Sequence, residues 1–89
     1  MRQQEPPNKL RLTHLRRELW TALELALAAM APNDIVDPLA TSAGLLDALL
    51  EFPDDAPPVV ATLPRALALA DGGLSAWHQW EERRGKGSA

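Results

Sequence analysis

The 89-residue sequence contains no cysteine and no tyrosine. Without cysteine there are no disulfide bonds, no thiolate metal sites and no cysteine nucleophile, which agrees with a reducing compartment. Three tryptophans and one phenylalanine are the only aromatic residues. The interior of the fold must therefore consist mainly of leucine and alanine.

Long hydrophobic runs are missing as well. The longest, from Leu19 to Ala31, is about half the length of a membrane-spanning helix and contains Glu24. A secretory signal is disfavoured because Glu24 interrupts the apolar run and Pro32 directly follows the candidate cleavage site. We therefore expect a cytoplasmic protein that makes no use of a membrane.

Catalytic sequence motifs are also absent. Phosphate-binding loops, dinucleotide fingerprints, nucleophile elbows and zinc-helix motifs need fixed residues at fixed spacing, and none is present. His14 and His78 are the only side chains suited to general-base catalysis near neutral pH. Ser75 lies three residues before His78, but a capping serine and a solvated histidine explain this spacing more simply. We therefore predict that the protein is not an enzyme and has no catalytic residues.

Aspartate pairs are the only candidates for a metal site. Asp34 with Asp37, and Asp54 with Asp55, lack the alternating oxygen ligands and the turn glycine of a calcium loop. Helix capping accounts for Asp37 and Asp55 without an ion. The sequence thus predicts neither a metal ion nor a cofactor.

What is present is the composition and the period of a helical protein. Hydrophobic residues are 46% of the chain and charged residues 24%, close to globular averages and far from those of disordered chains. Apolar residues recur at three- and four-residue steps, as in amphipathic helices. We predict an all-α, single-domain bundle of about four helices, at residues 8–31, 38–52, 57–71 and 74–84, between a mobile lead-in (1–7) and a frayed tail (85–89).

Local signals set the first two helix boundaries. Asn8 or Thr13 would cap the first helix, and Pro32 follows its predicted end. Asp37-Pro38 is a capping residue followed by proline, a pair typical of a helix start because the first amide needs no intrahelical partner. The second helix is therefore expected to begin at Pro38.

The later boundaries depend on proline and glycine. Asp55 is placed to cap the third helix, in which Pro64 either makes a kink or begins a new segment capped by Thr62. Gly72-Gly73 is expected to end it. A short fourth helix would then follow, with Ser75 as its cap.

Charge is unevenly distributed along the chain. Residues 21–62 contain seven acidic residues and no basic one. A one-signed acidic surface repels phosphate backbones and steers basic partners. The basic residues gather before and after this segment, at Lys9, Arg11, Arg16 and Arg17 and again at Arg83, Arg84 and Lys86.

Trp77 and Trp80 lie one helical turn apart, with Arg83 and Arg84 close by. Tryptophan and arginine are the residues most enriched at the energetic centres of interfaces. These tryptophans either pin the last helix to the core or act as exposed binding anchors. The predicted contact residues for a protein partner are Trp77, Trp80, Arg83, Arg84 and the acidic edge Asp47, Glu51, Asp54 and Asp55.

The sequence therefore favours a non-catalytic protein–protein interaction module, such as an adaptor, inhibitor, antitoxin-like partner, assembly chaperone or docking domain. Seven arginines against two lysines suggest a bacterial or phage origin, and the leucine-rich helices leave a homodimer open. The alternative is a nucleic-acid-binding regulator that uses Lys9, Arg11, Arg16 and Arg17. The pI near 5.2 and the lack of a stacking platform among these residues argue against that alternative.

Overall fold

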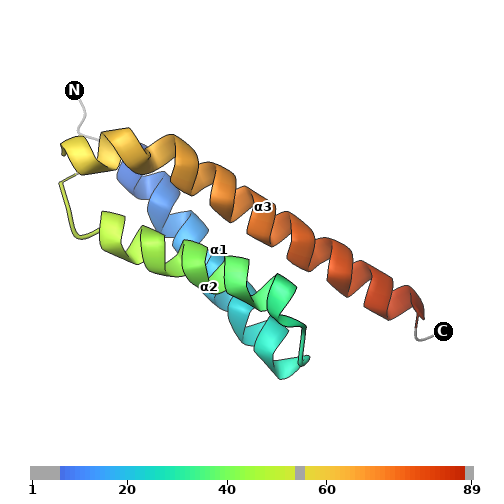
Figure 1. Ribbon diagram of the computed structural model, residues 1–89. Coiled ribbons are helices and arrows are strands. Elements are labelled where there is room, and N and C mark those ends of the chain that lie inside the picture. Colours follow the sequence, from blue (N-terminus) through green and yellow to red (C-terminus); the bar gives the residue numbers. More distant parts are fainter. Residues whose placement is uncertain (1–6, 54–55, 88–89) are drawn as a thin grey trace.

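A computed structural model describes residues 7–53 and 56–87, which form three helices and no strand (Figure 1). They are α1 (Pro7–Ala28), α2 (Asn33–Leu49) and α3 (Pro57–Gly87). The prediction of an all-helical fold is confirmed for this part of the chain, but the helix count is three and not four. The molecule is elongated, with extents of 54 × 25 × 18 Å.

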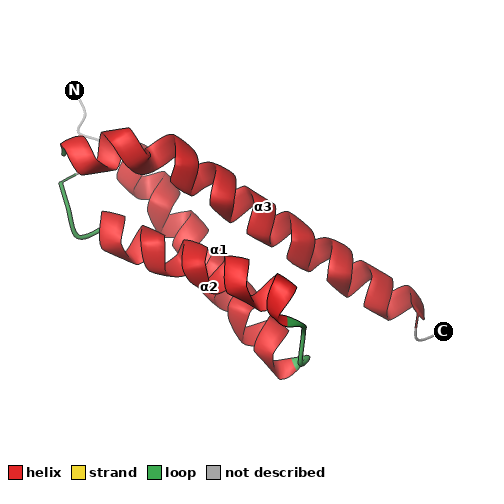
Figure 2. Cartoon of the chain, in the orientation of Figure 1, coloured by secondary structure: helices red, strands yellow, loops and turns green. Residues whose placement is uncertain are grey.

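The three helices run up, down and up. α1 and α2 form a hairpin through a short loop, and a longer connection leads to α3, which returns antiparallel to α2 (Figure 2). α2 packs extensively against both of its neighbours, whereas α1 and α3 contact each other much less. The side of the bundle between α1 and α3 is consequently the more open one.

α1 ends at Ala28, three residues before the predicted end. The amide of Ala31 donates to the carbonyl of Ala26 at 2.9 Å, and that of Met30 donates to Leu27 at 3.1 Å. This pair of bonds closes a helix whose terminating residue is left-handed, and Met30 has a φ of 60°. The apolar residues of the sequence continue beyond the last helical residue because Ala31 still packs against the core.

The start of α1 also differs from the prediction. The helix begins at Pro7, before both candidate caps, Asn8 and Thr13. The Thr13 hydroxyl donates instead to the carbonyl of Lys9 at 2.8 Å, the bond that a threonine inside a helix makes one turn back. The predicted lead-in, residues 1–7, lies outside the described residues except for Pro7.

α2 begins at Asn33, five residues before the predicted start at Pro38, and ends at Leu49. The carbonyl of Pro32 accepts bonds from the amides of Ile35 and Val36 at 2.9 and 3.1 Å, so the first turn forms without Asp37 as a cap. Pro38 lies inside the helix and removes one backbone bond. Burial of Ile35 against the core favours the additional turn.

α3 is one helix of 31 residues where two were predicted. Pro64 lies inside it, and neither Gly72 nor Gly73 has a positive φ. Glycine weakens a helix interior by about 1 kcal/mol but does not forbid it, so contact with α2 decides the outcome. The predicted break at Gly72-Gly73 is therefore wrong, and residues 85–87 of the predicted tail belong to α3.

The core lies along α2 and consists mainly of leucine and alanine. Leu19, Leu39 and Leu46 are completely buried, and Trp77 is 3% exposed. Alanines at the contacts allow the helices to approach closely. The fully buried side chains of the described residues include Leu12, Leu19, Ala26, Leu39, Ser42, Ala43, Leu46, Val59, Ala66 and Ala70.

Candidate interaction surface

The two neighbouring tryptophans of α3 have different environments. Trp77 is buried in the core, whereas Trp80 is only partly buried at its edge. Their rings stack at 5.7 Å between centroids with an interplanar angle of 24°. Because α3 continues through Gly72-Gly73, these residues do not lie on a short terminal helix as predicted, and Trp77 pins the second half of a long helix to the bundle.

Arg84 extends this aromatic pair toward the end of α3. Its Cζ atom lies over the Trp80 ring, 5.3 Å from the centroid, a cation–π geometry. Arg83, one residue earlier, is exposed and lies about 100° around the helix from Arg84. Trp77, Trp80 and Arg84 thus form one ladder of side chains, and Arg83 is outside it.

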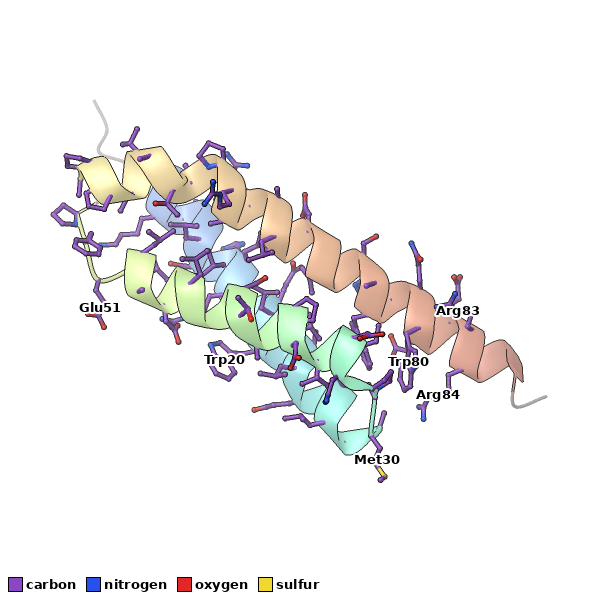
Figure 3. All side chains as sticks on the ribbon, viewed as in Figure 1. Trp20, Met30, Glu51, Trp80, Arg83 and Arg84 are labelled. Atoms are coloured by element: carbon purple, nitrogen blue, oxygen red, sulfur yellow. The ribbon has the colours of Figure 1, made fainter. Side chains whose placement is uncertain are left out.

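The predicted partner-binding residues lie at opposite ends of the molecule. Trp80, Arg83 and Arg84 are near the C-terminal end of α3, while Glu51 is beyond the C-terminal end of α2, at the far end of the long axis (Figure 3). Asp54 and Asp55 lie outside the described residues. Glu51 and the tryptophan ladder therefore do not meet in one contact region.

The predicted acidic and basic surfaces meet at one ion pair. Nη1 of Arg16 on α1 lies 3.3 Å from Oδ1 of Asp47 on α2, with the two side chains 44% and 42% exposed. Such partly exposed pairs contribute little, about 0.2–1 kcal/mol. Each residue therefore offsets part of the charge that the other would present to a partner.

The four basic residues of α1 are all exposed but do not share one face. With 3.6 residues per turn, Arg11 lies about 140° around the helix from Arg16 and about 160° from Lys9. Arg17 lies about 100° from Arg16 and lines the groove described next. The positive charge is thus distributed around α1.

A groove of about 340 Å³ opens between α1 and α3. Leu25 of α1 and Leu74 and Trp77 of α3 form its mainly apolar lining, while Glu18 and Glu81 stand on opposite helices at its rim. Leu25 is 50% exposed although the groove that it lines also borders the buried Trp77. Of the groove lining, Trp77 was predicted as a partner-binding residue and Arg17 as a nucleic-acid contact of the alternative function.

The sequence carried one signal for this groove. Leu25 lies about 100° around α1 from Ala26, which is fully buried, so it stands off the main apolar stripe. Single exposed leucines are common and need no explanation by themselves. The groove becomes recognisable only when α3 places Leu74 and Trp77 opposite Leu25.

A hollow beside the groove contains an arrangement with a chemical resemblance to a catalytic site. Ser75, His78 and Glu82 line it along one side of α3. Within residues 56–87, no hydrogen bond joins Ser75 to His78, the contact that nucleophile activation requires. The described part of the chain contains no group of three histidine, aspartate or glutamate side chains able to hold a metal ion.

Comparisons of the chain with models of protein families, with curated proteins and with solved structures find no match. Within the described residues, no helix is both long enough and apolar enough to cross a membrane.

Proposed function

We propose that the chain is a non-catalytic protein–protein interaction module that receives its partner in the groove between α1 and α3. The observation that carries this proposal is the apolar lining of Leu25, Leu74 and Trp77 on the open side of the bundle. Concave apolar surfaces with a polar rim are typical of protein interaction sites. An adaptor, inhibitor, antitoxin-like partner, assembly chaperone or docking domain of a bacterial or phage system would work in this way.

The tryptophan ladder supports the same assignment. Trp77 lines the groove and stacks on Trp80, which is held in turn by Arg84. Stacked rings that are already rigid lose little conformational entropy when a partner binds, which favours affinity. We assign Trp77 to the floor of the groove and Trp80 with Arg84 to its support.

Nucleic-acid binding is the weaker alternative. The ion pair between Arg16 and Asp47 and the distribution of Lys9, Arg11 and Arg17 around α1 provide no concentrated positive face. Phosphate contacts from such a surface would have to overcome a net charge of −3.

Site-specific photocrosslinking in the native cell tests the proposed function. A photoreactive phenylalanine analogue would replace Leu25, which is half exposed, so that the larger side chain can extend into solvent. The matched control carries the analogue at Thr41, which is exposed on α2 and outside the groove. We expect a covalent adduct with another protein at position 25 and none at position 41.

Two results would contradict the proposal. One is the same adducts at both positions, which indicates random collisions. The other is no protein adduct at position 25, provided that circular dichroism shows the helical fold of the variant. An adduct between two copies of the chain would show that the groove binds a second copy, as in a homodimer, and not a different protein.

A further inference from the structure

We infer that the groove between α1 and α3 accepts a short amphipathic helix whose apolar face is flanked by lysine or arginine. This inference rests on the proposed function and names the chemistry of the partner. The length of the groove, its lining and the charges at its rim each contribute to it.

The length of the groove fits about two turns of helix. Its lining runs from Arg17 to Leu25 on α1 and from Leu74 to Glu81 on α3. At 1.5 Å per residue these stretches are about 12 and 11 Å long. A helix laid between α1 and α3 would place two or three apolar side chains, spaced by three or four residues, against Leu25, Leu74 and Trp77.

Acidic side chains predominate at the rim. Glu18 and Glu81 face the groove from opposite helices, and Glu82 lines the adjoining hollow together with Glu81 and His78. Arg17 is the one basic residue of the lining. All three glutamates are exposed, and in the described ranges no ion pair engages them.

Charge also distinguishes this partner from a second copy of the chain. Two copies paired groove to groove would bring Glu18 and Glu81 of both copies into one interface, since a twofold interface joins identical surfaces, with Arg17 of each copy as the one basic residue of the lining to offset them. Like charges in an interface disfavour association. On α3, Arg84 is held over Trp80.

A pair of designed peptides tests the inference. The first is a labelled 14-residue helical peptide with leucines on one face and lysines on both flanks, and the second carries glutamate in place of each lysine. Fluorescence anisotropy with the full chain should give binding of the lysine peptide about tenfold tighter than that of the glutamate peptide. The difference should shrink as salt screens the rim.

Matched charge reversals locate the effect. Glu81→Lys alters the rim of the groove, and Glu51→Lys makes the same charge change at an exposed position outside it. We expect Glu81→Lys to weaken binding of the lysine peptide about threefold or more, and Glu51→Lys to leave it nearly unchanged. Equal losses in both variants would show a long-range charge effect and overturn the assignment to the groove.

Other outcomes separate this inference from the proposed function. Equal binding of the two peptides overturns charge selection. Binding of neither peptide, while the photoreactive residue at position 25 still captures a protein, overturns the basic-helix partner and leaves the interaction module intact. Self-association that either peptide competes away would identify the occupant as a second copy.

Discussion

Gly73 lies directly against the main chain of Pro38, so that a Cβ atom added to Gly73 would be 3.5 Å from both the carbonyl carbon and the carbonyl oxygen of Pro38. This is where α3 crosses α2. Proline and glycine are the residues least suited to a helix interior, yet each lies inside a helix here. A Cβ atom at this distance would make an ordinary van der Waals contact with α2, so the crossing leaves room for an alanine side chain but little beyond it.

Substitutions of the two glycines test the continuity of α3. A Cβ atom on Gly72 would meet nothing within 4 Å, so Gly72→Ala should stabilise the protein by about 0.5–1 kcal/mol through higher helix propensity. Thermal unfolding should rise by a few degrees. If the chain turned at this position with a left-handed glycine, the same substitution would lower stability.

The crossing itself is tested by a larger side chain. Gly73→Leu should destabilise by about 1–3 kcal/mol because its side chain meets Pro38 and Leu39. Gly72→Leu is the matched control, since that position is exposed. Denaturant unfolding of both variants measures the difference, and equal stability of the two would exclude the close contact between α2 and α3.

The left-handed residue after α1 provides a second prediction. Met30 has a φ of 60° and is 86% exposed, so its side chain adds little packing to offset the strain of this conformation. Met30→Gly should stabilise the protein by about 1 kcal/mol. Met30→Ala, which removes the side chain and keeps the strain, should change the free energy of unfolding by less than about 0.5 kcal/mol.

A buried hydroxyl provides the third. Ser42 on α2 is completely buried, and no other described residue offers its Oγ a hydrogen-bond partner. An unsatisfied buried polar group costs about 1–3 kcal/mol, so Ser42→Ala should raise the free energy of unfolding by about 1–2 kcal/mol. Thr41→Ala, at an exposed neighbour, should gain no more than about 0.7 kcal/mol from helix propensity. A loss of stability in Ser42→Ala would indicate a bond to the hydroxyl.

The two tryptophans should differ in their energetic roles. Trp77→Ala removes a ring that is 3% exposed and should cost about 3–5 kcal/mol, a large part of the stability of a small domain. Trp80→Ala should retain the fold and lose about 1–2 kcal/mol from the ring stack and the contact with Arg84. Denaturant unfolding monitored by far-UV circular dichroism distinguishes them, and similar losses would contradict the assignment of Trp77 to the core.

Several helix features could be predicted from local residues alone. The three- and four-residue period of apolar residues predicted an amphipathic first helix, and Leu12, Leu19, Ala22 and Ala26 of α1 are buried in the core. Such a pattern is reliable because its period is a property of the helix itself. The helix ends were predicted less well. Asp37-Pro38 is a favourable start signal, but α2 already begins at Asn33 and does not use it.

The candidate site was predicted only in part. Trp77 and Trp80 are adjacent in sequence and their stacking follows from one helical turn. Leu25, Glu18 and Glu81 escaped prediction because their proximity to α3 or α1 depends on how far the two helices separate. The ion pair between Arg16 and Asp47 could not be predicted either, because it depends on how α1 packs against α2.

The sequence by itself determined that the chain is helical and that leucine and alanine fill its core, since both follow from the period and size of neighbouring side chains. Tertiary structure decided whether Gly72-Gly73 ends a helix, because the cost of about 1 kcal/mol per glycine is small enough for packing against α2 to outweigh. It also decided which polar residues share a surface. Residues that share a surface come from separate helices, and no local sequence pattern encodes the distance between two helices.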